Sequence, residues 1–78
     1  MTKLEGKLWQ FGYYQNPNYN NIFYKRINDD YNIEMVIING NIYWNIINIS
    51  QQNNSQNYSQ AFNELQKDLE EFKKYEKE

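Results

Sequence analysis

Apolar and polar residues alternate most clearly over residues 31–49, where two strand-length runs are joined by Asn39-Gly40. Asn-Gly between such runs predicts a β-hairpin, because both central residues of a type I′ turn adopt positive φ. A two-residue loop at Asn39-Gly40 would place Met35 opposite Trp44 and would fix the register of the whole hairpin.

This register sorts the side chains of the hairpin onto two faces of the predicted sheet. One face is apolar and has the composition of a core: Tyr31, Ile33, Met35, Ile37, Ile42, Trp44 and Ile46. The other face is half polar and half apolar: Asn32, Glu34, Val36, Ile38, Tyr43, Asn45, Ile47 and Ile49. A small protein whose sheet is apolar on both faces needs something to cover each face.

Two further strands are expected before this hairpin. Residues 3–14 alternate and predict a first strand, while residues 21–27 predict a second strand that ends in a loop at residues 28–30. A two-residue loop would turn Ile22 toward the core, whereas a three-residue loop would turn Phe23 toward it. The sequence leaves both alternatives open.

The period changes to that of a helix over residues 58–78. Apolar side chains recur at steps of three and four and form one stripe: Tyr58, Phe62, Leu65, Leu69 and Phe72. The charged side chains from residue 64 onward are expected to face solvent. We therefore predict a single α+β domain over residues 1–78. It has a four-stranded antiparallel β-meander (1–49), a polar connector (50–57) and one C-terminal amphipathic helix packed on one face (58–78), in the order ββββα.

The composition argues against catalysis. The chain of 78 residues contains no cysteine and no histidine, which removes disulfides, thiolate ligands and the usual general base near neutral pH. Asp29 and Asp30 are adjacent, and this pair favours a turn over a metal site. We expect no catalytic residue, no metal site and no cofactor.

Charge and hydropathy bear on location. The net charge of −2 gives no electrostatic argument for binding nucleic acid or anionic lipid. No run of the sequence approaches the roughly 20 apolar residues that a membrane span requires. The amino-terminal residues lack the apolar region of a signal peptide. Asn, Ile, Lys and Tyr, which A/T-rich codons encode, are abundant. We expect a cytoplasmic protein of a low-GC bacterium, or of its host cell if a phage encodes it, without membrane contact.

The half-apolar sheet face is the feature that bears most on function, because apolar patches with tyrosines are typical of interface cores. The candidate partner-binding residues are Tyr13, Tyr14, Tyr19, Tyr24, Tyr43 and Ile47. We expect a non-enzymatic module that occludes a site on a larger protein or protein complex. Phage and mobile-element inhibitors of host defence, such as anti-CRISPR proteins, are of this type.

Several alternatives stay open. The same face is also suited to joining two copies in a homodimer, or to being closed by the first strand in a small barrel, and the outer strands offer free edges for strand addition. Lys7, Lys25 and Arg26 lie among aromatic residues, a pattern found in single-stranded nucleic-acid binders. A bacterial immunity protein or antitoxin, and a homo-oligomer enclosing a small ligand, are further alternatives.

Overall fold

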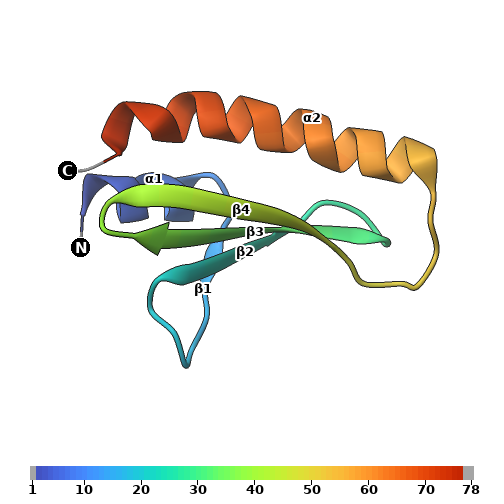
Figure 1. Ribbon diagram of the computed structural model, residues 1–78, viewed down its shortest axis with the longest axis horizontal. Helices are drawn as coiled ribbons and strands as arrows, with labels where there is room; N and C mark the ends of the chain where they lie inside the picture. Colours follow the sequence, from blue (N-terminus) through green and yellow to red (C-terminus); the bar gives the residue numbers. More distant parts are fainter. Residues whose placement is uncertain (1, 77–78) are drawn as a thin grey trace.

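The sheet follows the predicted topology. In a computed structural model that describes residues 2–76, four antiparallel strands form one sheet in the order β1-β2-β3-β4. The elements in chain order are α1 (Lys3–Gln10), β1 (Tyr14–Gln15), β2 (Ile22–Arg26), β3 (Tyr31–Ile38), β4 (Asn41–Asn48), α2 (Ser55–Phe72) and a 3₁₀ turn η1 (Lys73–Tyr75) (Figure 1). The four-stranded α+β meander with its C-terminal helix is confirmed.

The β3–β4 hairpin has the predicted register. Asn39 and Gly40 form its turn with φ values of 53° and 78°, as a type I′ turn requires. Met35 lies opposite Trp44, and Ile37 lies opposite Ile42. The local turn chemistry therefore determines which side chains of this hairpin face the core.

The β2–β3 connection is the three-residue alternative. The Asn28 side-chain oxygen accepts hydrogen bonds from the backbone N–H groups of Asp30 and Tyr31, each at 3.0 Å, which closes the turn without a glycine. Phe23 lies opposite Met35 in the resulting register and is fully buried.

The prediction of a strand over residues 3–14 is wrong, because Lys3–Gln10 is helix α1 and only Tyr14–Gln15 is strand. A capping box starts the helix: the Thr2 hydroxyl accepts from the Glu5 N–H at 3.1 Å, and the Glu5 carboxylate accepts from the Thr2 N–H at 3.0 Å. Leu4 and Leu8, one turn apart, are both buried. The buried Leu4–Leu8 pair and the capping box therefore decide the structure of this segment, and the alternating aromatic pattern does not.

Helix α2 begins earlier than predicted. Asn54 is its N-cap, with a side-chain oxygen that accepts from the Asn57 N–H at 3.0 Å. Ser55 is therefore already helical, three positions before Tyr58, and the polar connector is correspondingly shorter.

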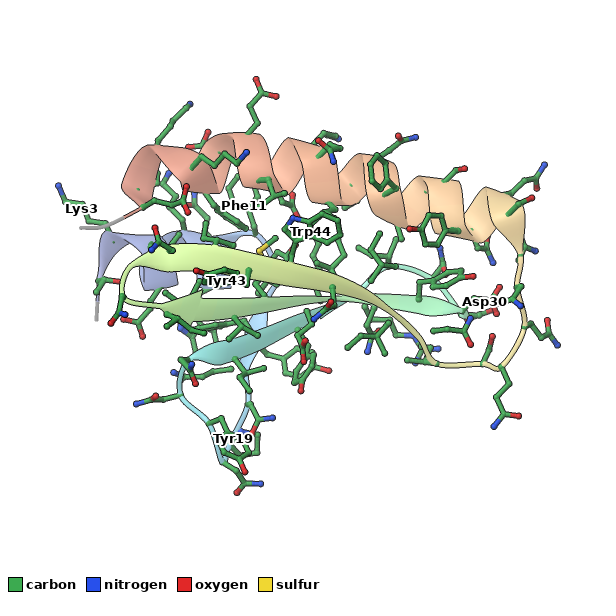
Figure 2. The ribbon with its side chains drawn as sticks, viewed as in Figure 1. Lys3, Phe11, Tyr19, Asp30, Tyr43 and Trp44 are labelled. Atoms are coloured by element: carbon green, nitrogen blue, oxygen red, sulfur yellow. The ribbon has the colours of Figure 1, made fainter. Side chains whose placement is uncertain are left out.

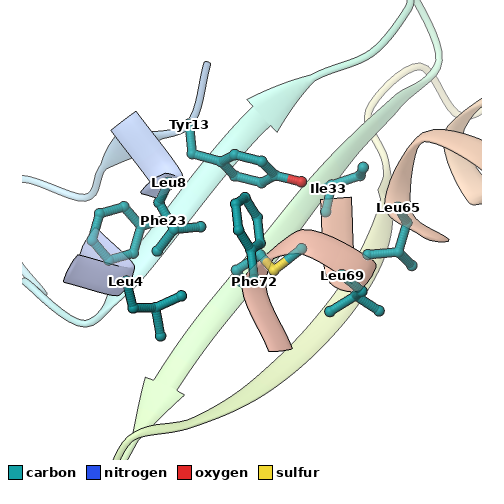
Figure 3. Close-up of a cluster of buried hydrophobic side chains, with 9 residues drawn as sticks. Leu4, Leu8, Tyr13, Phe23, Ile33, Leu65, Leu69 and Phe72 are labelled. Atoms are coloured by element: carbon teal, nitrogen blue, oxygen red, sulfur yellow. The ribbon is translucent and has the colours of Figure 1, made fainter. Parts of the chain in front are cut away.

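Both helices lie on the same face of the sheet and share one core (Figure 3). Its buried members are Leu4, Leu8, Tyr13, Phe23, Ile33, Met35, Leu65, Leu69 and Phe72. Phe72 at the end of α2 meets the rings of Phe11 and Tyr13 edge to face, with centroid distances of 5.2 and 5.6 Å. This packing ties the start and the end of the described chain together and leaves the opposite face of the sheet without a helix.

Candidate functional site

We call the sheet surface that points away from both helices the open face. Side chains alternate along a strand, so the register places on this face Tyr14, Ile22, Tyr24, Arg26, Asn32, Glu34, Val36, Ile38, Asn41, Tyr43, Asn45 and Ile47. Within residues 2–76, β1 pairs with β2 and not with β4. The predicted alternative of a closed barrel is therefore wrong, and the sheet is open.

An apolar row crosses the open face. Val36 lies between Ile22 on β2 and Tyr43 on β4, and Tyr43 is 54% exposed. Ile38, one pleat further along β3, is also exposed. Ile22 and Val36 are half-buried, so the row combines half-buried and exposed apolar side chains, which is the composition of an interface core.

A second row, parallel to the first, is more polar. Tyr24 lies between Tyr14 and Glu34, and the two tyrosine rings are 6.0 Å apart. The Glu34 carboxylate accepts a 3.0 Å hydrogen bond from the Asn45 amide on β4. These polar side chains flank the apolar row, as the rim of a protein interface does.

The candidate partner-binding residues do not all lie together. Four of them are on the open face: Tyr14, Tyr24, Tyr43 and Ile47. Tyr19 lies at the exposed tip of the loop between β1 and β2, outside the strands that form that face (Figure 2). Tyr13 was expected to contact a partner, but it is 1% exposed and belongs to the core beneath the helices. Its place in the helix–strand junction, rather than in a strand, turns it inward.

Tyr13 instead takes part in a buried polar cluster. Its hydroxyl donates to the Asp68 carboxylate at 2.7 Å, and the same oxygen accepts from the Lys25 ammonium at 2.9 Å. Lys25 also reaches Glu64 at 3.1 Å. These four residues connect α2 to β2 and to the start of β1.

Burial and pairing shift the pKa values in this cluster. Burial raises the pKa of the Tyr13 phenol, and the hydrogen bond to Asp68 adds to that rise. Burial also raises the pKa of Asp68, although its hydrogen bonds with Tyr13 and Lys25 oppose the rise. The hydrogen bond from Lys25 lowers the pKa of Glu64. Each of these polar groups has a hydrogen-bond or ion-pair partner, which is typical of a cluster that stabilises the fold.

The expectation that the charges of α2 face solvent therefore fails at Asp68, which is 1% exposed. Sequence reasoning missed this residue, although a signal was available. Asp68 lies three positions after Leu65 and next to Leu69, within the apolar stripe of the helix. A carboxylate in that position requires a buried donor.

The three cations of the nucleic-acid alternative do not form one surface. Lys7 on α1 pairs with Glu71 at 3.8 Å, and Lys25 is held in the cluster beneath α2. Arg26 lies on the other side of the sheet, on the open face, at 3.7 Å from Asp29. The basic aromatic hairpin expected from the sequence is thus divided between the two faces.

Asp30 also has a structural role, because its side chain joins three segments of the chain. It is buried, and its carboxylate accepts from the Ser50 hydroxyl at 2.6 Å and from the Asn57 amide at 2.7 Å. These hydrogen bonds lower the pKa of Asp30. The β2–β3 turn is in this way joined to the connector and to the first turn of α2.

A cleft of about 240 Å³ opens beside the start of α1. Its lining is partly apolar, with Leu4, Phe23 and Ile37. The Glu5 carboxylate in its wall already accepts from the Thr2 N–H in the capping box. Among the described residues, no group of acidic side chains is placed to hold a metal ion, and no helix within residues 2–76 has the length and apolar character to cross a membrane.

Comparison of the chain with models of known protein families, with curated proteins and with solved structures finds no match. The open face is therefore the feature on which a functional argument rests.

Proposed function

We propose that the protein is a non-enzymatic binding module that contacts another protein through the open face. The observation that carries this proposal is the apolar row of Ile22, Val36 and Tyr43, on a face that no described helix covers. Burying such a row against a partner would stabilise the complex by roughly 25 cal/mol for each Å² of apolar surface removed from water.

Charge favours a polypeptide over a nucleic acid as the partner. On the open face, the charged side chains are Arg26 and Glu34, whose charges are opposite. A nucleic-acid surface needs several unpaired cations that follow the phosphates. Lys7 and Lys25, which were candidates for that role, pair with carboxylates of α2.

The strands that carry the open face have a register fixed by a three-residue turn and a type I′ turn. A preformed surface loses little conformational entropy when it binds. This property suits a module that covers a site on a larger protein with one-to-one stoichiometry. We propose a component of a host defence complex as the class of target.

The test compares open-face variants with a surface control. The Tyr43→Ala and Ile47→Ala variants, and Asn63→Ala on the exposed side of α2, are used to capture proteins from a low-GC bacterial extract, and the Kd for the captured protein is measured by calorimetry. We expect each open-face variant to raise the Kd at least tenfold, about 1.4 kcal/mol. Asn63→Ala should match the wild type.

Two outcomes would contradict the proposal. If Tyr43→Ala and Ile47→Ala both unfold, the face is part of the core and not a binding surface. If the captured partner is a nucleic acid whose affinity falls steeply with salt, the contact is with phosphates. An apolar protein interface should change little between low and high salt, and the melting temperatures of both variants should stay close to that of the wild type.

A further inference from the structure

β4 is a long and unprotected sheet edge. It spans eight residues, Asn41–Asn48, and has a neighbour on one side, β3. Its sequence, NIYWNIIN, has no charged residue and no proline. Natural proteins commonly protect an edge strand with lysine, proline, a bulge or a short length, because exposed N–H and C=O groups invite pairing with another strand. β4 has none of these devices.

The backbone groups of β4 that point outward can be assigned. The Ile49 N–H donates to the Asp30 carbonyl at 2.8 Å, on the side of β3, whereas the Ile42 N–H donates to the Glu76 carboxylate at 3.0 Å, on the other side. Because backbone groups alternate in an antiparallel ladder, those of Trp44 and Ile46 also point away from β3. In the described part of the chain, no other segment accepts a hydrogen bond from the N–H groups of Trp44 and Ile46.

Apolar side chains flank this edge on both faces. Trp44 points to the helix side but is 40% exposed, whereas Met35 opposite it on β3 is fully buried. On the open face, the neighbouring Tyr43 is more exposed still. Figure 2 shows both side chains beside β4, which lies in front of β3 in that view. On the helix side of β4, Ile42 and Ile46 pack against the core, whereas Trp44 between them stays exposed.

We propose that β4 pairs antiparallel with β4 of a second copy of the chain and forms one continuous sheet of two meanders. The polarity of the strand is symmetric about Asn45, which has Trp44 and Ile46 on either side, followed by Tyr43 and Ile47. Pairing around a twofold axis at Asn45 sets Trp44 of one copy against Ile46 of the other on the helix side. Tyr43 then faces Ile47 of the other copy on the open face.

At its centre, this register uses backbone groups whose N–H has no other partner among the described residues. Trp44 and Ile46 of the two copies exchange N–H···O=C bonds. The next hydrogen-bonded position would pair Ile42 with Asn48 of the other copy, but the Ile42 N–H stays with the Glu76 carboxylate, so the paired segment ends before Ile42. Asn45 meets its own equivalent as a pair that is not hydrogen-bonded through the backbone. No like charges are brought together, because the strand carries none.

The pairing closes after two copies. The opposite edge of the sheet is β1, a strand of two residues followed by Pro17, which offers too short a template for the same contact. A symmetric edge-to-edge contact of this kind gives a dimer and not a filament. The proposal does not depend on the proposed function, since a monomer presents the open face as well.

The first experiment measures the mass in solution by light scattering at micromolar concentration and at two salt levels. We expect twice the chain mass of 9.6 kDa, with little effect of salt. The Asn45→Lys variant should be monomeric or have a dimer Kd at least tenfold higher, because two ammonium groups meet at the axis. Asn45 is exposed in the single chain, so the substitution leaves the core intact, and the melting temperature of the variant checks that the fold is retained. Ile38→Lys adds the same charge to β3 and should stay dimeric.

A second measurement tests the axis directly. The native chain has no cysteine, so an Asn45→Cys variant holds one thiol, placed within reach of its equivalent for a disulfide. We expect oxidation to give a cross-linked dimer much faster than for Asn63→Cys on α2. A wild-type mass of 9.6 kDa at all concentrations, a dimer that survives Asn45→Lys, or equal cross-linking of the two cysteine variants would each overturn the proposal.

Discussion

The hydroxyl of Tyr13 donates a 2.7 Å hydrogen bond to the carboxylate of Asp68, which lies 55 positions later in the chain. Both groups are withdrawn from solvent, and Lys25 contacts the same carboxylate oxygen at 2.9 Å. A buried carboxylate is stable only with such partners. The contact therefore helps to fix how α2 is rotated against the helix-covered face of the sheet.

Removal of the Tyr13 hydroxyl should destabilise the protein. Tyr13→Phe keeps the ring against Phe72 but leaves Asp68 with one donor fewer, and we expect a loss of about 1–2 kcal/mol in the free energy of unfolding, measured in urea. Tyr43→Phe, a change at an exposed hydroxyl, is the matched control and should alter stability by less than about 0.5 kcal/mol. Equal effects of the two changes would show that the buried bond contributes nothing.

Asp30 should make stability depend on pH at the acidic end. Hydrogen bonds from Ser50 and Asn57 hold the pKa of Asp30 below its ordinary value of 3.8. A carboxyl whose pKa is lower in the folded than in the unfolded state stabilises the fold above the unfolded value, and this stabilisation is lost as the pH falls through the folded pKa. The wild type should therefore be more stable than Asp30→Asn at pH 6.

Unfolding curves of both proteins between pH 6 and pH 2 test this expectation. The difference between them isolates Asp30, because every other carboxyl titrates in both proteins. It should be constant above about pH 5 and should shrink as the pH falls through the ordinary value of 3.8 toward the lower folded pKa. A difference that stays constant down to pH 2 would mean that these hydrogen bonds do not favour the ionised carboxylate.

Neighbouring residues of α1 should respond differently to truncation. Leu8 is fully buried, whereas Trp9 is 47% exposed. Leu8→Ala should cost about 2–5 kcal/mol of unfolding free energy, since it leaves a cavity among Leu4, Phe23 and the end of α2. Trp9→Ala should cost much less, despite the larger side chain. The reverse order would contradict the placement of α1 on the sheet.

Replacement of two different glycines by alanine should change the free energy of unfolding in opposite directions. Gly40 has a φ of 78° in the hairpin turn, and Gly40→Ala should destabilise by roughly 1–2 kcal/mol because an L side chain is strained there. Gly6 lies inside α1 with no atom within 4 Å of an added Cβ. Gly6→Ala should stabilise by about 0.5–1 kcal/mol. Chemical denaturation of both variants measures the two shifts, and a shared sign would be inconsistent with this backbone.

The parts of the fold that the sequence predicts are those set by local chemistry. Asn39 and Gly40 specify a turn type, and the turn specifies the register of eight residues on each side. The sequence leaves the length of the β2–β3 loop undecided, because the contact that closes the loop is made by the side chain of Asn28. Nothing in the alternation of the flanking strands indicates that contact.

The first helix was missed for a related reason. The helix contains a glycine and leads into the alternating aromatic residues Trp9, Phe11 and Tyr13, and both features favour a strand. The deciding features are the Thr2–Glu5 capping box and the burial of Leu4 with Leu8 against Phe23. Burial of that kind arises from tertiary packing, which the order of residues does not display.

The sequence predicts where some of the candidate residues lie, but not all of them. Tyr14, Tyr24, Tyr43 and Ile47 share the open face because strand alternation places them there. Tyr13 and Lys25 were assigned to surfaces although both face Asp68. Their positions depend on a helix at the other end of the described chain, so no local pattern could indicate them.

The position of Phe72 has a consequence for synthesis on the ribosome. The strands and α1 are translated first, but the pocket between Phe11 and Tyr13 is filled by a ring that comes from the last turn of α2. Until that ring leaves the exit tunnel, the nascent chain carries an incomplete core together with an unpaired strand edge. Such partly folded chains are prone to association, so the time between translation of β4 and the emergence of Phe72 is the interval in which the nascent chain is most exposed to it.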